Sequence, residues 1–317
     1  NYSRISFNFG PTLLSWMEKK QPGVYQAILE ADRESRGHFS GHGSALAQAY
    51  NHMIMPLANR RDKYTQTFWG IRDFEHRFGR RPEGMWLPET GVDLETLKIM
   101  AELGIRFTIL SPYQVQRFRR IGDEQWREVK PGGIDTTRPY RVSLGGNQAI
   151  YVFFYNGEIS QAVAFEKLLA NGERFIGRLL GGFDGRGASQ LIHIATDGET
   201  YGHHHRHGDM ALAFALHQIK SNQLAQITNY PEYLEHHPPE YEAEIREYSA
   251  WSCAHGVERW SGNCGCSSGM NPGWSQAWRG PLRKALNWLR DELAPLYEKQ
   301  ARLLLKDPWE ARNNYIT

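Results

Sequence analysis

Two acidic side chains follow apolar segments, at the kind of position where barrel enzymes place catalytic carboxylates. Glu89 comes directly after the apolar run at 84–88, and Asp197 comes directly after the apolar run at 191–196. The active sites of α/β barrels are built at the carboxyl ends of the strands, so such residues can face each other across the barrel. Two carboxyl groups held about 5 to 5.5 Å apart are what hydrolysis of a glycosidic bond with retention of configuration requires.

This chemistry requires the two carboxyl groups to differ in pKa, because the nucleophile must be ionised while the acid/base holds a proton. Each residue also has a simpler interpretation. Glu89 can cap the helix that follows it or face solvent, and Asp197 can form an Asx turn before Gly198. Both alternatives stay open from the sequence alone.

Catalytic carboxylates at strand ends need strands and helices that alternate along the chain. The apolar spacing predicts strands at 84–88, 105–110, 149–156 and 191–196, and helices at 62–78, 93–104, 160–170, 173–182, 208–220 and 281–305. Strand, helix and strand in this order form the unit of a parallel sheet covered by helices, so the predicted fold class is α/β. Residues 111–148 and 225–245 lack a sustained period and are predicted to be loops, the first with a short hairpin as an alternative.

The length and composition fit one large packed domain. The chain has 317 residues, of which 40% are hydrophobic and 23% are charged. The formal charge of +2 leaves no electrostatic footprint for nucleic acid or an anionic membrane. No apolar run approaches the roughly 20 residues that span a bilayer, and the first residues lack the pattern of a signal peptide. We therefore expect neither nucleic acid nor a membrane as a partner.

Four motifs occur in order along the chain. They are FNFGPTLLSW at 7–16, NHMIMPL at 51–57, GMWLPET at 84–90 and TDGETYGHHH at 196–205, and a segment rich in His and Trp follows them. In this combination the chain resembles glycoside hydrolase family 57, whose members include α-amylases, 4-α-glucanotransferases and branching enzymes. The resemblance covers most of the chain. It implies an incomplete seven-stranded β/α barrel with C-terminal helices, and a retaining reaction on an α-glucan oligo- or polysaccharide.

The resemblance also implies roles for individual residues. Glu89 stands in the position of the family's W-L-x-E glutamate and would be the nucleophile, and Asp197 stands in the position of the D-G-E aspartate and would be the acid/base. Asn8 and His52 match rim positions that bind substrate. Trp86, beside the nucleophile, would be a structural or subsite residue.

The family normally begins with a strand that carries an H-x-P motif, whose His contacts the substrate. This chain begins at Asn1, so we expect that strand and that His to be missing. On this division residues 1–245 form the barrel core, truncated at its N-terminus, and residues 246–317 form a segment rich in His, Cys and Trp with helices packed on the barrel.

A dense run of histidines follows the second acidic motif. Its members are His203, His204, His205 and His207. Such a run can bind a metal ion, position sugar hydroxyls or face water, and His203 is predicted to bind substrate. A metal ion held there beside Asp197 would make the chain a deacetylase of polysaccharides on a similar barrel, which is one alternative function. Another is a carbohydrate-binding domain without turnover. The retaining reaction itself needs no cofactor.

The three cysteines lie close together near a histidine. Cys253, His255, Cys264 and Cys266 offer three thiolates and one imidazole, which is a complete tetrahedral ligand set. They predict a structural zinc site, with an iron–sulfur site as the less favoured choice and reduced buried thiols as the alternative. An odd, clustered set of cysteines is no disulfide framework, so we expect a reducing compartment, the cytoplasm.

Aromatic residues surround the cysteines. Trp260 and Trp274 are predicted to stack on sugar rings, although packing explains two or more of the neighbouring tryptophans, which include Trp251 and Trp278, equally well. The family resemblance gives His255 a competing role, because the last family motif brings a His or an aromatic residue to the substrate.

Overall fold

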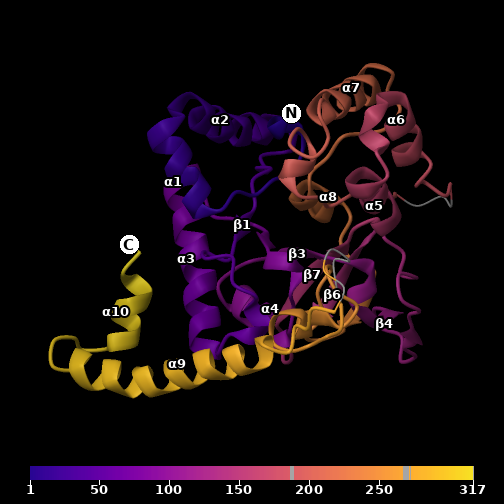
Figure 1. Ribbon diagram of the computed structural model, residues 1–317. Helices are drawn as coiled ribbons and strands as arrows, with labels where there is room; N and C mark the ends of the chain where they lie inside the picture. Colours follow the sequence, from indigo (N-terminus) through magenta and orange to yellow (C-terminus); the bar gives the residue numbers. More distant parts are fainter. Residues whose placement is uncertain (186–188, 267–270, 272, 317) are drawn as a thin grey trace.

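The computed structural model describes residues 1–185, 189–266, 271 and 273–316. Its α-helices are α1 (Pro11–Lys20), α2 (Pro22–His38), α3 (Arg60–Phe78), α4 (Leu94–Glu102), α5 (Gly157–Phe165), α6 (Gly172–Leu180), α7 (Gly208–Ser221), α8 (Tyr230–His236), α9 (Arg279–Ala301) and α10 (Pro308–Asn314). Its strands are β1 (Ala47–Gln48), β2 (Met85–Trp86), β3 (Phe107–Leu110), β4 (Val115–Arg120), β5 (Arg127–Glu128), β6 (Pro139–Ser143), β7 (Ala149–Phe154) and β8 (Tyr241–Ile245). In Figure 1, α1 and α3 stand to the left of the strands, α5 to α7 lie above them, and α9 runs along the bottom.

The strands form a parallel series that continues into a mixed sheet. β1 pairs in parallel with β2, and parallel bridges between Phe7 and Ala45 and between Gly84 and Phe107 extend this series on both sides. β3 pairs in parallel with β7, and from there the order is β3-β7-β6-β8-β4-β5, with β6 antiparallel to β7. The α/β class is confirmed. A seven-stranded barrel is not confirmed, because pairing among the described residues gives one two-stranded and one six-stranded sheet.

The loop prediction was wrong for 225–245, whereas in 111–148 the hairpin alternative is confirmed by the antiparallel pair of β4 with β5. Residues 111–148 contribute β4, β5 and β6, and residues 225–245 contribute α8 and β8. In the antiparallel pair of β4 with β8, Arg117 lies opposite Glu244, and their side chains form an ion pair at 2.8 Å. Cross-strand pairs of opposite charge stabilise a sheet, but such strands lack the apolar run by which a buried strand is recognised.

The apolar segment at 191–196, predicted as a strand, has no strand partner among the described residues. The backbone N–H of Leu191 donates to the carbonyl of Thr137 (2.9 Å), and that of Asn156 donates to the carbonyl of His193 (2.9 Å). The segment thus meets the loop before β6 and the residue that caps α5, and neither presents a strand edge. The prediction of a strand was therefore wrong. Asp197 nevertheless follows directly after this extended segment, as it would have followed the predicted strand.

The predicted helices are present except at 160–170, where α5 ends at Phe165 and a 3₁₀ turn, Leu168–Ala170, follows Lys167 with its φ of 55°. Asn59 caps α3 by accepting from the backbone N–H of Asp62 (2.9 Å), and the helix stops before Gly79, as predicted. Asp93 caps α4 by accepting from the backbone N–H of Thr96 (2.9 Å). None of the helices in the described ranges combines the length and the apolar character needed to cross a membrane.

The core is divided into three clusters. The largest lies between the strands and α1 to α4, a second lies among α5 to α7, and a third joins the ends of β3 and β7 to α8. The buried ion pair of Lys63 with Asp93 (2.5 Å) fastens α3 to the start of α4. These layers hold Trp86 of β2 and the segment before Asp197 around one opening.

Close packing of α3 on β1 generates a prediction about stability. A Cβ atom at Gly70 would lie 2.0 Å from the carbonyl oxygen of Gln48. Because backbone cannot yield as a side chain can, we expect Gly70→Ala to lower the free energy of unfolding by about 1–3 kcal/mol in urea titrations. In the control Gly177→Ala, where nothing lies within 4 Å of the new Cβ, better helix propensity should raise it by up to about 1 kcal/mol. Equal stability of the two variants would contradict this packing.

Candidate active site

Glu89 occupies an unusual backbone conformation directly after β2. It lies in a short 3₁₀ turn, Pro88–Thr90, with a φ of 54° and a ψ of 21°. Thr90, the next residue, also has a positive φ of 52°. Left-handed conformations of residues other than glycine cost roughly 1 to 3 kcal/mol and gather at functional sites. The observed backbone therefore marks this turn as a functional candidate.

Neighbouring segments hold the turn in place. The backbone N–H of Trp251 donates to the carbonyl of Glu89 (3.1 Å) and to Oγ1 of Thr90 (3.0 Å). From another direction, Nε2 of Gln114 donates to the carbonyl of Thr90 (2.8 Å). The turn is thus stabilised by residues far from it in sequence.

The side chain of Glu89 has a specific donor. The indole Nε1–H of Trp251 donates to Oε2 of Glu89 at 2.9 Å, and the ring of Trp86 meets the ring of Trp251 edge-to-face at 5.2 Å. Helix capping does not explain Glu89, because Asp93 caps α4. Among the described residues, Oε2 of Glu89 therefore has a hydrogen-bond donor and Oε1 has none.

Asp197 begins the 3₁₀ turn Gly198–Thr200, but its side chain makes no capping hydrogen bond. The structure therefore does not support the alternative in which the Asp197 side chain forms an Asx turn. Burial and the negative charges of Glu89 and Glu199 raise the pKa of Asp197, while His204 and His52 oppose this. Asp197 has a large solvent-accessible area, but the surrounding walls of the groove partly desolvate its carboxyl group. Glu89 and Asp197 are therefore near enough to interact electrostatically.

Tyr155 is a member of this site that the sequence analysis missed. It follows β7 directly, and burial together with the charge of Asp197 raises its pKa to about 12, against the effect of a hydrogen bond from Ser111. Its ring meets that of Trp251 at 6.1 Å. A neutral phenol beside a carboxyl group can donate a hydrogen bond. Glu89 was identified from its position directly after a strand. The same position after β7 could have identified Tyr155.

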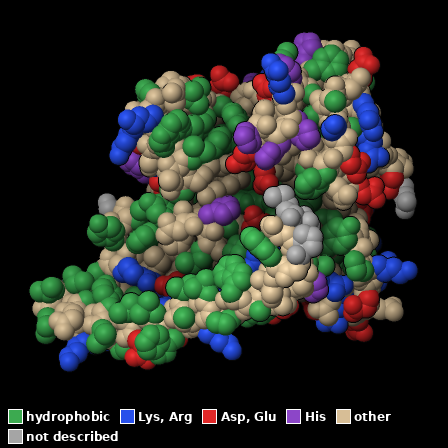
Figure 2. Space-filling model, viewed as in Figure 1, with side chains coloured by type: hydrophobic (Ala, Val, Ile, Leu, Met, Phe, Trp, Pro, Cys, Tyr) green, Lys and Arg blue, Asp and Glu red, His purple; other side chains and the backbone are tan. Residues whose placement is uncertain are grey.

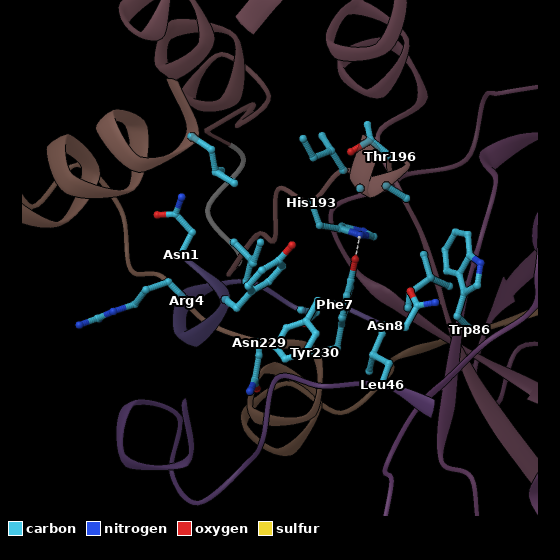
Figure 3. A pocket seen from close by; sticks show the side chains of 18 of the residues that line it. Asn1, Arg4, Phe7, Asn8, Leu46, Trp86, His193, Thr196, Asn229 and Tyr230 are labelled. Atoms are coloured by element: carbon cyan, nitrogen blue, oxygen red, sulfur yellow. Dashed lines mark hydrogen bonds between the residues drawn. The ribbon is translucent and has the colours of Figure 1, made fainter. Parts of the chain in front are cut away.

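A groove of about 2510 Å³ reaches this site at Trp86 and Asp197, whereas Glu89, Tyr155 and Trp251 are not among the described residues that line it. Among the residues that line it are the predicted site residues Asn8, His52, Trp86, Asp197 and His203. Figure 3 shows Asn8 and Trp86 at one end of this groove and the hydrogen bond between His193 and Tyr230 further along it. Figure 2 shows His and acidic side chains gathered where this face of the molecule is hollowed.

Two of the lining residues have defined partners. Asn8 Nδ2 donates to Oε1 of Gln48 (2.6 Å), which fixes the orientation of its amide. His193 is buried, its Nδ1 lies 3.0 Å from the Tyr230 hydroxyl, and burial lowers its pKa to about 4. A neutral imidazole thus forms part of the groove wall. The sequence analysis missed both Gln48 and His193.

Three residues predicted to bind substrate lie elsewhere. His255, Trp260 and Trp274 are not among the described residues that line the groove. Trp274 is 78% exposed near the start of α9, and His255 lies with the cysteines. Contact of these three residues with a substrate stays a prediction.

The potential metal ligands gather at the cysteines. Among the described residues, one group of three or more ligating side chains has all its ligand atoms within 4.8 Å of one another, namely Cys253, His255, Cys264 and Cys266. The histidine run is not part of such a group, and His205 instead lies 3.0 Å from the carbonyl of Ala164 through Nε2. The deacetylase alternative therefore lacks a formed ligand set beside Asp197 in the described part of the chain.

Comparison with known sequences gives matches over two regions. The model of the family described as glycosyl hydrolase family 57 matches residues 3–246, and a domain of unknown function, DUF3536, matches residues 274–317. A curated protein, α-amylase 1 of Dictyoglomus thermophilum, is 28% identical over 107 residues, which are 33% of this chain and 15% of that protein.

Comparison with solved structures supports the fold. An exo-type maltose-forming amylase from Pyrococcus sp. ST04 has a TM-score of 0.79 and 18% identity, over 98% of this chain and 54% of that one. A 4-α-glucanotransferase from Thermococcus litoralis has a TM-score of 0.57 and 20% identity, over 78% of this chain and 37% of that one. A branching enzyme from Pyrococcus horikoshii has a TM-score of 0.56 and 20% identity, over 79% of this chain and 57% of that one. The chain spans between a third and three fifths of the length of these proteins.

The electrostatic contacts of Asp197 generate a prediction. Glu199→Gln removes a negative charge, so we expect the pKa of Asp197 to fall. Titration of the aspartate side-chain carboxyl carbons by ¹³C NMR measures this without any turnover. The control is Glu173→Gln, the same change at an exposed position in α6, which should leave the titration unchanged. An unaltered titration of Asp197 in Glu199→Gln would show that the two groups do not interact.

Proposed function

Since the chain belongs to glycosyl hydrolase family 57, we propose that it is a retaining enzyme that hydrolyses or transfers α-glucan chains through a covalent glycosyl-enzyme intermediate. The observation that carries this proposal is the pair of unlike carboxyl groups. The pKa of Asp197 is raised by burial and by the charge of Glu89, whereas Glu89 accepts a hydrogen bond from Nε1 of Trp251. An ionised group beside a protonated one is the arrangement that retaining hydrolysis uses.

In the first step Glu89 is the nucleophile. One carboxylate oxygen attacks the anomeric carbon, and the bond from that carbon to the glycosidic oxygen breaks. Asp197 gives its proton to the departing oxygen, so the leaving chain departs as a neutral alcohol. The glycosyl unit is then bound to Glu89, and Asp197 is ionised.

In the second step Asp197 acts as the base. It takes the proton from an incoming hydroxyl group, whose oxygen attacks the anomeric carbon as the bond to Glu89 breaks. Water as the acceptor gives hydrolysis, and a sugar hydroxyl gives transfer. Two inversions at one carbon restore the original configuration, and both carboxyl groups return to their starting protonation.

A polymeric substrate is supported by the size of the groove. Its volume of about 2510 Å³ exceeds the roughly 300–1,000 Å³ of pockets for small molecules. The amide of Asn8, held by Gln48 (2.6 Å), and the indole of Trp86 offer a polar group and a flat apolar face near the turn of Glu89. The names of the similar proteins, an α-amylase, a glucanotransferase and a branching enzyme, favour an α-glucan.

Trapping of the intermediate tests the assignment of both carboxylates. Incubation with a fluorinated glucosyl donor that has a good leaving group should add one glycosyl unit to the peptide that carries Glu89, as measured by mass spectrometry. Asp197→Asn should still be labelled, because such a leaving group needs no acid, yet its turnover of glucan should fall by about 10²- to 10⁴-fold. Glu89→Gln should not be labelled.

Two results would contradict the proposal. Label on a residue other than Glu89 would remove it as the nucleophile. Glucan binding to the chain with neither label nor product would favour a carbohydrate-binding domain without turnover.

The hydrogen bond from Trp251 to Glu89 leads to a prediction about turnover. Trp251→Phe removes the donor of the 2.9 Å bond but keeps an aromatic ring. Because the carboxylate of Glu89 then loses the bond that orients it, kcat should fall by about 10- to 100-fold with little change in KM.

The matched control is Trp126→Phe, since Trp126 packs on Arg117 and Arg119 of β4 and does not line the groove. This variant should keep the kcat and KM of the unchanged chain. An unchanged kcat in Trp251→Phe would mean that the indole does not orient the carboxylate of Glu89.

A further inference from the structure

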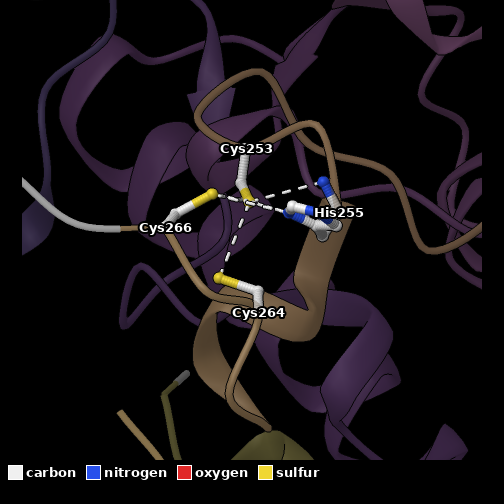
Figure 4. Close-up of side chains that lie close together, drawn as sticks. All are labelled: Cys253, His255, Cys264 and Cys266. Atoms are coloured by element: carbon white, nitrogen blue, oxygen red, sulfur yellow. Dashed lines mark hydrogen bonds between the residues drawn. The ribbon is translucent and has the colours of Figure 1, made fainter. Parts of the chain in front are cut away.

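The cysteine cluster lies between the two regions that match known families, in residues 253–266. Figure 4 shows Cys253, His255, Cys264 and Cys266 turned toward one another from two stretches of one loop. The described part of this loop holds one short regular element, the 3₁₀ helix Gly256–Trp260. A loop of this length with little secondary structure needs additional interactions, such as side-chain or metal contacts, to hold one conformation.

The distances within the cluster match a tetrahedron around one ion. Sγ of Cys253 lies 3.9 Å from Sγ of Cys264 and 3.6 Å from Sγ of Cys266. Nδ1 of His255 lies 3.6 Å from Sγ of Cys253 and 3.4 Å from Sγ of Cys266. With zinc–sulfur bonds of about 2.3 Å and zinc–nitrogen bonds of about 2.0–2.1 Å, tetrahedral geometry gives edges of about 3.8 Å and about 3.6 Å. The four ligand atoms are therefore spaced as zinc ligands are.

The same distances exclude the other chemistries of clustered cysteines. The cysteines are free, and sulfur atoms 3.6 to 3.9 Å apart are well beyond the bond of about 2.05 Å in a disulfide. In a cluster of two or more irons, ligands that bind different iron atoms stand further apart, whereas here every ligand atom lies within 4.8 Å of the others.

Neighbouring groups orient the sulfur atoms and balance their charge. The backbone N–H of His255 donates to Sγ of Cys253 (3.4 Å), and that of Cys266 donates to the sulfur of Cys264. The side chain of Gln276 contacts Sγ of Cys264 (3.7 Å) and donates to the carbonyl of Cys266. The guanidinium of Arg279, at the start of α9, interacts electrostatically with Cys264. Outer groups of this kind are typical of metal sites, and a cation suits three thiolates whose charge exceeds that of one divalent ion.

We propose that Cys253, His255, Cys264 and Cys266 bind one Zn²⁺ ion in a structural site. Four protein ligands complete the tetrahedron and leave no position for substrate or water, so the ion orders the loop and takes no part in catalysis. It would join the loop to the start of α9 through Gln276 and Arg279. His255 then has a role in the metal site in place of a contact with the substrate.

The loop that carries the proposed zinc ligands, residues 253–266, directly follows Trp251, which contacts Glu89. Trp251, two residues before Cys253, supplies the N–H and indole donors to the turn of Glu89. The loop is fixed at a second point, where the backbone N–H of Val257 donates to the carbonyl of Tyr248 (2.8 Å). There Gly256, with a φ of 60°, leaves no room for a Cβ atom, which would lie 2.1 Å from that carbonyl oxygen. Zinc therefore makes Trp251 a well-ordered positioning residue, a role that rests on the proposed function of Glu89.

Metal analysis of the full chain tests the zinc site without any assay of activity. The chain purified under reducing conditions should contain one zinc per molecule, and Co²⁺ in its place should show the absorption of a tetrahedral thiolate site. Cys264→Ser and His255→Gln should each bind Zn²⁺ at least about 10-fold more weakly in competition with a coloured chelator. His217→Gln, an exposed histidine on α7, should bind it normally.

Three results would overturn the zinc site: less than half an equivalent of zinc after equilibration with Zn²⁺, unchanged affinity in both ligand variants, or an iron–sulfur absorption spectrum. The positioning role has its own test. Loss of zinc in Cys264→Ser should lower kcat with little change in KM, as Trp251→Phe does. A variant that has lost zinc and stability but keeps the original kcat and KM would overturn the positioning role and leave the zinc site standing.

Discussion

The candidate active site depends on a backbone turn that is unfavourable by itself. Glu89 and Thr90 both have positive φ values, and neither is a glycine. Hydrogen bonds from Trp251 and Gln114, which belong to other parts of the chain, hold the turn. Each of these donors is placed in turn by the mixed sheet or by the loop that follows it. The conformation of the nucleophile candidate is therefore a property of the whole packed molecule, because a turn of this kind would relax in an isolated segment.

The unlike environments of the two carboxyl groups follow from the same packing. Trp251 brings an N–H donor to Glu89, whereas Asp197 lies at the end of a segment that offers its side chain no capping bond. Burial in the groove and the charge of Glu89 then raise the pKa of Asp197. Tyr155, a neutral phenol with a pKa of about 12, completes the surroundings of the pair. A hydrogen-bond donor at Glu89 and burial at Asp197 thus give two carboxyl groups of similar chemistry different surroundings.

Regular elements escaped sequence analysis where their pattern departs from the usual apolar alternation. β4 and β8 carry charged side chains that pair across the sheet, such as Arg117 with Glu244. Each of these segments therefore forms a strand because the other is beside it. The opposite error occurred at 191–196, which is as apolar as a buried strand. Its backbone bonds go to Thr137 and Asn156, where no strand edge is available. In both cases the deciding factor was the partner, which local sequence does not contain.

The sequence by itself determined the residue types at the site, most of the helices, the α/β class and the membership in a family whose motifs stand in order. It also placed three cysteines and one histidine within reach of one ion, because short spacing limits how far apart they can lie. Only the tertiary structure decided the mixed sheet, the left-handed turn of Glu89, the donor from Trp251 and the neighbourhood of Asp197. The reason is physical: periodicity and capping act over a few residues, whereas a pKa shift or a strained turn depends on groups that meet only when distant segments pack together.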